Sequence, residues 1–496
     1  MNSKNSKKAV GLNVLTLTMM NIAAVVSLRG LPSEAEYGLG SIFYYLFAAI
    51  VFLIPVAMIS AELAAAYPKK GGVYRWVGEA YGSRLGFLAI WLQWIQNTIW
   101  FPTVLTFSAV SIAYIGASPE AASVPLANNK IYVAIVCLII YWGATLINLR
   151  GLSASSKISK YGGIIGTIIP AALLTIFGII WLVMGKPLQL DTSIKTLFPN
   201  LSNLNNLVLA SSIFLFFAGM ELSAVHVTEI DNPQKNYPKA ILSAALISVC
   251  IFIFGTLSIG FVLPAKSINL TQGLLVAFDK YLVAYHLGFL TPVIAIMLVL
   301  GVLAGVSTWI GGPSKGLLAV GHHGLLPLFL QKTNKNGVQV NILLVQGCIV
   351  TVLILLFTFM NSVQAVYQVL SQLTVILYLT MYILLFISGM KLRKTEPDVE
   401  RPFKVPGGKY GIYILGILGC VGALLALVLS FLPPAQIKIG SKTVWYLILF
   451  IGYFVFVGLP LLIYKLRKPE WVNENAKDAL EPFNWELKKE AKNANK

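Results

Sequence analysis

Two short stretches each place an ionisable side chain beside a glycine, within apolar segments long enough to cross a membrane. They are residues 27–32 and 217–223, whose central residues are Ser27, Arg29 and Gly30 in the first and Phe217, Gly219 and Glu221 in the second. Charged groups at membrane depth are costly and mark substrate or ion pathways. Paired glycine- or proline-interrupted segments point to a transporter's binding site. The sequence therefore predicts that both stretches line one substrate site.

A helix break exposes backbone groups that suit an amino acid. Unpaired N–H groups and the positive end of a half-helix favour a carboxylate. Freed carbonyl groups on the other half favour an ammonium group or a cation. A zwitterionic amino acid therefore fits such a site without any charged side chain.

Arg29 adds a fixed cation that can bind a carboxylate through two hydrogen bonds. It is predicted to bind an acidic substrate or to balance Glu221. Two other interpretations stay open: the side chain reaches the outer membrane interface, or it pairs with Glu34 or Glu36. The first interpretation is favoured because Arg29 adjoins the break.

Glu221 is a carboxylate deep within the sixth apolar segment. It is predicted to act in ion coupling as a protonatable gate, or to contact the substrate directly. Alternatively, it is a neutral side chain that is hydrogen-bonded to the broken backbone. Lys160, at the start of the fifth segment, is a second candidate for ion coupling, and a role as a positive anchor at the membrane surface is equally compatible with its position.

Aromatic residues in later segments are the remaining candidates for the substrate site. They are Trp309, Tyr378 and Tyr382. Tyr378 and Tyr382 share one helix face because they are four residues apart. Each aromatic residue taken alone is compatible with simple core packing.

The composition requires a helical membrane protein. Of 496 residues, 57% are hydrophobic and only 11% are charged, with a mean hydropathy of +0.78, whereas soluble domains carry about 25% charged residues. Apolar runs of about 20 residues, enough to span the hydrocarbon core, recur along the chain. The fold class predicted is an all-α polytopic membrane protein with about twelve transmembrane helices. The predicted spans are residues 11–37, 39–67, 84–116, 130–149, 158–184, 204–228, 239–263, 288–311, 339–360, 364–388, 411–432 and 443–466.

The two breaks fall in the first and sixth spans, which predicts two five-span halves. An odd number of spans per half places the halves in opposite orientations, the inverted-repeat arrangement of many secondary transporters. The transporter domain is predicted at residues 11–466. Within it, repeat one covers about 11–184, repeat two about 204–388 and two extra helices about 411–466, and the tails are 1–10 and 467–496.

The charge pattern predicts the orientation in a bacterial cytoplasmic membrane. With a cytoplasmic N-terminus, the N-terminal tail and the loops on its side hold 21 Lys/Arg, the C-terminal tail 8 and the opposite loops 7. This positive-inside bias predicts that both termini are cytoplasmic. The net charge of +18 then favours contact with anionic lipid rather than with nucleic acid.

The motifs of several enzyme and pump classes are missing from the sequence. It contains no phosphate-binding loop, zinc motif or nucleophile motif, which argues against an ATP-driven pump and a membrane hydrolase. The four cysteines show no metal-ligand spacing and are predicted to be buried thiols. Neither a cofactor nor a metal is expected, and the choice between monomer and dimer stays open.

Five further segments carry a family resemblance. They are residues 62–76, 219–233, 300–316, 373–382 and 401–408. With them the chain resembles the amino acid–polyamine–organocation superfamily and, within it, the bacterial glutamate/γ-aminobutyrate antiporters. The resemblance implies alternating access, with substrate held between the broken spans. It assigns Glu221, Trp309, Tyr378 and Tyr382 to the pocket and gate, and Phe217 to a position that closes over the substrate. It also places Lys160 where sodium-coupled relatives hold a sodium ion.

The sequence departs from those antiporters at two pocket positions and in its tail. An acidic residue of the eighth span is Gly305 here, and a tyrosine of the first span falls at about Arg29. The tail is shorter and lacks histidine, so a pH-dependent plug is not expected. The sequence therefore predicts a secondary active antiporter that exchanges an anionic or zwitterionic, glutamate-like amino acid for a related amino acid or its decarboxylation product. A proton-coupled symporter and a binding-only amino-acid sensor are the alternatives.

Overall fold

The structure is a computed structural model. It describes residues 13–69, 71–116, 125–150, 161–198, 207–222, 230, 232–360, 362–435, 438, 440–473 and 481–494. Within these ranges the chain is almost entirely helical, and ten helices are long and apolar enough to cross a membrane. The polytopic all-α prediction is confirmed.

The ten helices coincide with the predicted spans two to five and seven to twelve. They are α3, η2 and α4 together (Gly40–Ala66), α6 (Ser83–Ile115), α7 (Lys130–Leu149), η4 and α9 within Tyr161–Val183, α11 (Pro233–Val262), α13 (Thr291–His322), α14 (Val340–Phe359), α15 (Val363–Thr395), α16 (Gly411–Phe431) and α17 (Lys442–Lys465). Two of them contain a π-helical turn, at Ala49–Leu53 and Ile164–Ile168. Such turns are frequent at functional sites.

The first and sixth spans are interrupted. The first consists of α1 (Val14–Val25), the short helix η1 (Leu28–Gly30) and α2 (Leu31–Ala35). The sixth begins with η7 (Leu209–Ser211) and α10 (Ser212–Phe216), and the chain then turns at Gly219, which has a φ of +107°. Glycine alone adopts that conformation without strain, so Gly219 permits the second break.

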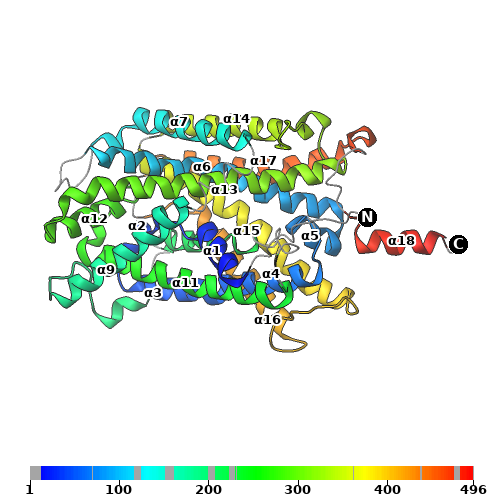
Figure 1. Ribbon diagram of the computed structural model, residues 1–496, viewed down its shortest axis with the longest axis horizontal. Coiled ribbons are helices and arrows are strands. Elements are labelled where there is room, and N and C mark those ends of the chain that lie inside the picture. Colours follow the sequence, from blue (N-terminus) through cyan, green and yellow to red (C-terminus); the bar gives the residue numbers. More distant parts are fainter. Residues whose placement is uncertain are drawn as a thin grey trace, which may run out of the picture.

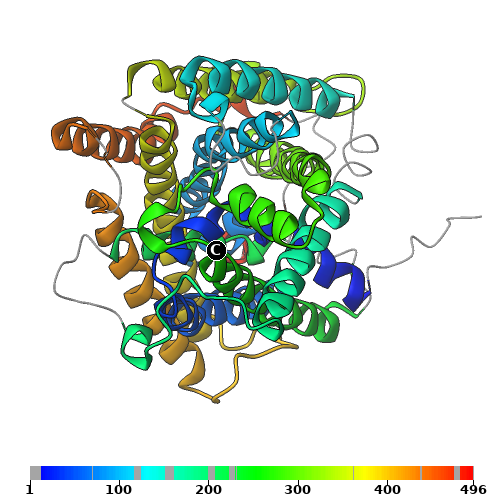
Figure 2. The same ribbon diagram turned by 90° about the vertical axis from the view of Figure 1, so that its left-hand side faces the viewer.

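The helices run side by side along the long axis of the molecule (Figure 1). The connecting helix α12 (Gly273–Ala284) lies at one end, and α5 (Val73–Tyr81) and α18 (Asn484–Ala494) lie at the other. Seen end-on, α7 and α14 form a pair on one side of the bundle (Figure 2). Almost the whole length of α6 is buried, and it packs against both α13 and α15.

The eighth span is longer than predicted. It was expected to end at residue 311, but α13 continues through Pro313 to His322. Proline has no N–H to bond the carbonyl four residues earlier. Here that carbonyl belongs to Trp309, and it accepts a hydrogen bond from Asn97 Nδ2 of α6 at 2.8 Å. This bond satisfies the freed carbonyl and ties α6 to α13 at the level of Trp309.

The end of the C-terminal tail packs against α5. Phe483 is only 4% exposed, and the Arg75 guanidinium lies 5.1 Å from its ring centre. Arg75 also donates to the carbonyls of Glu481 and Pro482, at 2.6 and 2.8 Å. Burial raises the pKa of Glu79, although its ion pair with Arg75 acts in the opposite direction. The aromatic residues of an otherwise charged tail thus anchor it to the helical domain.

Candidate substrate site

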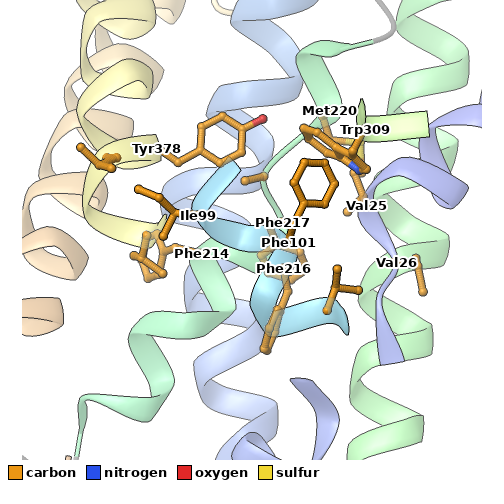
Figure 3. Packing of buried hydrophobic residues seen from close by; sticks show 14 of the residues in the cluster. Val25, Val26, Ile99, Phe101, Phe214, Phe216, Phe217, Met220, Trp309 and Tyr378 are labelled. Carbon is orange, nitrogen blue, oxygen red and sulfur yellow. The ribbon is translucent and has the colours of Figure 1, made fainter. Parts of the chain in front are cut away.

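A small cavity lies at the meeting point of the two interrupted spans. Its wall comes from the first, third, sixth, eighth and tenth spans, and its lining residues are Val25, Ser27, Arg29, Asn97, Trp100, Leu215, Phe216, Ala218, Trp309 and Tyr378. Figure 3 shows Tyr378, Trp309 and Val25 around the interrupted sixth span, together with Phe216 and Phe217. Four residues predicted from the sequence therefore line this cavity: Ser27, Arg29, Trp309 and Tyr378.

Glu221 is held by donors from two long helices. Its Oε1 accepts from the Tyr378 hydroxyl at 2.7 Å and from Gln93 Nε2 at 3.0 Å, and its Oε2 accepts from the Tyr382 hydroxyl. The Tyr382 oxygen in turn accepts from the Gly219 N–H at 2.7 Å. The side chain is 2% exposed. Three donors suit an ionised carboxylate, and the network fixes the turn of the sixth span to α15.

The two breaks touch through glycines. A Cβ atom on Gly30 would lie 2.0 Å from Phe216 Cζ, so only glycine lets this ring reach the first span. A Cβ atom on Gly219 would approach Trp309 Cζ2 to 3.3 Å. At each break, therefore, the absence of a side chain on glycine lets an aromatic ring of another span come close to the backbone. These contacts join the first span to the sixth and the sixth span to the eighth.

Arg29 is buried beside the cavity. It is 3% exposed, and its guanidinium carbon lies 5.6 and 5.7 Å from the ring centres of Trp100 and Tyr367. One terminal nitrogen donates to the Tyr367 hydroxyl at 3.0 Å, whereas Nε has no hydrogen-bond partner among the described residues. Within the same part of the chain no carboxylate forms an ion pair with Arg29. The predicted alternatives in which Arg29 pairs with Glu34 or Glu36, or balances Glu221, are therefore not what the structure shows.

Phe217, which was predicted to close over the substrate, does not line the cavity. Phe217 is fully buried and packs edge-on against Tyr45 and against Phe252, while its neighbour Phe216 lines the cavity. Lys160 lies outside the described residues, as does the last residue of the second stretch, Ser223.

Four residues of α6 and α15 that contact the cavity or the predicted site residues are absent from the sequence prediction. They are Gln93, Asn97, Trp100 and Tyr367. Asn97 is 1% exposed, and its Oδ1 has no partner among the described residues. It is thus an unused acceptor on a residue of the cavity wall. A polar side chain within an otherwise apolar span was the one available signal for Gln93 and Asn97.

A model of the amino acid permease family matches residues 12–456. The chain belongs to this family. It is 40% identical over 470 residues to an uncharacterized transporter of Legionella pneumophila, covering 95% of this chain and 99% of that protein. It is 33% identical to a glutamate/gamma-aminobutyrate antiporter of Lactococcus lactis, covering 93% of this chain and 91% of the relative. A probable agmatine/putrescine antiporter of the same species is 24% identical, over 87% of this chain and 90% of that one.

Membership of the amino acid permease family establishes the general role. The protein is an amino-acid transporter embedded in the inner membrane by multiple helices, and its substrate is a small molecule. The family and the named relatives are transporters rather than enzymes. The resemblance to glutamate/γ-aminobutyrate antiporters is likewise confirmed by the comparison.

Proposed function

We propose that the protein is an antiporter that exchanges a glutamate-like amino acid for a related amino acid or for the decarboxylation product of its substrate. The observation that carries the proposal is the Arg29 guanidinium, which is buried beside the cavity with no carboxylate paired to it among the described residues. A buried cation requires compensation. A substrate with an acidic side chain supplies it.

The remaining groups of the site suit the α-amino and α-carboxyl groups of such a substrate. N–H groups at the broken helices favour the carboxylate. Asn97 Oδ1, which has no partner among the described residues, is an acceptor for the ammonium group. The indole ring of Trp309 forms part of the cavity wall. A cationic substrate would instead place its side-chain charge against Arg29, so lysine and arginine are expected to be excluded.

Exchange by alternating access follows from the two interrupted spans. Their short half-helices can tilt while α6, α13 and α14 stay packed together. The positive-inside bias supports cytoplasmic termini, which puts α5 and α18 on the cytoplasmic side and α12 on the outer side. The glutamate/gamma-aminobutyrate antiporter named above, which is 33% identical to this chain, supports exchange over net uptake.

Counterflow in proteoliposomes tests the proposal. Vesicles loaded with unlabelled glutamate should accumulate labelled glutamate, and empty vesicles should not. Competition by neutral amino acids, γ-aminobutyrate, arginine and lysine would rank the substrates, with sodium replaced by potassium as the control for sodium coupling. Uptake that requires a sodium gradient, or a preference for lysine or arginine, would contradict the proposal.

The same assay separates the two alternatives. A proton symporter would take up substrate into empty vesicles when an inward proton gradient is imposed. A binding-only sensor would bind labelled substrate in detergent without any counterflow in vesicles. Antiport requires substrate on the inner side in every case.

A further inference from the structure

A second carboxyl group lies on the first interrupted span, outside the cavity wall. Glu34, in α2, is five residues beyond Arg29 and has an exposed fraction of 0%. Its Oε2 has no hydrogen-bond partner among the described residues, and no cation there lies within ion-pair distance of it. The substrate site as described makes no use of this group.

The one hydrogen bond of Glu34 depends on where a proton lies. The Ser33 hydroxyl donates to the Gly30 carbonyl at 2.6 Å, and the Ser33 oxygen lies 3.2 Å from Glu34 Oε1. Serine has a single hydroxyl proton. Because the shorter bond uses that proton, the longer contact is either a weak, shared donation from Ser33 to a Glu34 carboxylate or a donation from a protonated Glu34 to Ser33. Glu221 differs, since three donors point at its carboxylate.

Within the part of the chain that the structure describes, the surroundings of Glu34 offer no compensating charge. The titratable side chains near enough to interact with it electrostatically include Tyr37, Tyr44 and Tyr45. The Tyr45 hydroxyl pairs with Thr256, and the Tyr37 oxygen accepts from the N–H of Ala210. A buried carboxylate with no paired cation and only one weak, shared donor costs several kcal/mol.

The charged residues of the neighbouring elements are engaged elsewhere. Helix α2 packs against α11, α12, η1 and η7. On α12, Asp279 accepts from Thr291 and Lys280 donates to the carbonyl of Val262. The lysines of α11 lie in its first two turns, at the opposite end from α2, and Arg29 of η1 donates to Tyr367. Glu36, two residues from Glu34, is half-buried and is also a carboxyl group, so it supplies no compensating positive charge.

We propose that Glu34 is a proton-binding site that must be loaded for the first span to close. In the closed arrangement the proton is on Glu34 and is donated to Ser33. When α2 moves and Glu34 meets water, the carboxyl group releases the proton to water on that side. The inference goes beyond amino-acid exchange, because it makes protonation of a residue outside the substrate site a condition of each closure.

A direct spectroscopic test needs no transport. The infrared spectrum of the reconstituted protein at neutral pH should contain a carbonyl band of a protonated carboxyl group that Glu34→Gln removes and the matched control Glu36→Gln keeps. Persistence of the whole band in Glu34→Gln overturns the proposal. If Glu34→Gln does not fold, Ser33→Ala replaces it. Ser33→Ala removes the hydroxyl oxygen that accepts the hydrogen bond from protonated Glu34, so the carbonyl band should shift in frequency. An unchanged band would contradict the proposal.

The functional test is exchange as a function of external pH. One coupled proton makes the rate fall by up to tenfold per pH unit above the midpoint. Because glutamine is permanently neutral, Glu34→Gln should abolish this fall in rate above the midpoint (the alkaline limb of the pH profile). Glu36→Gln and the wild-type protein should keep the alkaline limb. A retained limb in Glu34→Gln, or its loss in Glu36→Gln, refutes the assignment. This functional test rests on the proposed function, because it measures exchange. If the wild-type protein shows the infrared band but no exchange at any pH, the proposed antiport is contradicted and the proton site at Glu34 is not.

Discussion

Replacement of Arg29 tests the substrate assignment most sharply. Arg29→Gln removes the positive charge and keeps a polar side chain of similar length. Because Arg29 forms no ion pair among the described residues, its removal strands no buried carboxylate there. A thermal unfolding curve close to that of wild type is therefore expected, and a loss of transport can be assigned to the site rather than to unfolding.

The magnitude follows from the contact that is lost. A hydrogen bond to a charged group contributes about 1.5–3 kcal/mol, and 1.4 kcal/mol corresponds to a factor of ten. Loss of one bond between Arg29 and a substrate carboxylate should raise the KM for glutamate by about 10- to 150-fold. Arg29→Lys keeps the charge but loses the planar fork that lies between the rings of Trp100 and Tyr367. An intermediate loss is expected for it.

Glutamine is the matched substrate for this experiment, because it differs from glutamate mainly by the missing side-chain charge. Counterflow of both substrates should be measured for wild type, Arg29→Lys and Arg29→Gln. The ratio of their KM values reports side-chain recognition, whereas general damage would change both values together. If Arg29→Gln keeps the wild-type preference for glutamate over glutamine, Arg29 does not read the substrate side chain and the reasoning fails.

Three further changes test the supports of the site. Gly30→Ala should abolish exchange, because the added Cβ atom would overlap the ring of Phe216. Gly143→Ala in α7 is the control and should leave exchange unchanged, because no atom lies within 4 Å of the added Cβ atom there. Equal exchange rates for the two variants would contradict the close packing of the two breaks. Tyr382→Phe breaks the hydrogen-bonded link from Gly219 to Glu221. Loss of about 1–3 kcal/mol should slow exchange about 5- to 150-fold. Tyr378→Phe should have a smaller effect, and the reverse order would count against the network. Glu62→Gln leaves Arg393, which donates to both carboxylate oxygens, without its buried partner. The free energy of unfolding should fall by about 3–5 kcal/mol, which should lower the melting temperature in detergent. The control Glu470→Gln, at an exposed position, should leave the melting temperature unchanged. An unchanged melting curve for Glu62→Gln would exclude a structural role for Glu62.

Sequence reasoning located the breaks because they violate the pattern around them. A charge or glycine inside a long apolar run stands out, so Arg29 and Glu221 could be singled out, and hydropathy defined the ten continuous spans. The pattern could not separate Phe216 from Phe217. Which of two adjacent aromatic rings faces the cavity depends on a turn whose geometry is set by the positive φ of Gly219.

The contributions of α6, and of Tyr367 in α15, could not be predicted. A helix buried on all sides carries no amphipathic stripe that identifies its functional face. The buried residues of α6 cover every face, which hides Gln93, Asn97 and Trp100 among packing residues. Tyr367 was missed because its role depends on Arg29, 338 positions away in the sequence. Contacts of this kind depend on the packing of spans, which a single sequence does not reveal.

The division into two inverted halves stays a prediction, but the contacts indicate what such halves would need to share. The first interrupted span carries the side chain proposed for the substrate anion, Arg29, and the carboxyl group proposed for the proton, Glu34. Both lie on short helices between α1 and α3, so one movement of this segment would expose both groups to water. Closure then buries a cation and a carboxyl group together. It is favourable when a substrate carboxylate compensates Arg29 and a proton neutralises Glu34, because an uncompensated charge at either position carries a desolvation cost. Closure that requires both the substrate and the proton favours exchange. A carrier that closes slowly without substrate reorients to the other side of the membrane mainly after it has bound another substrate molecule.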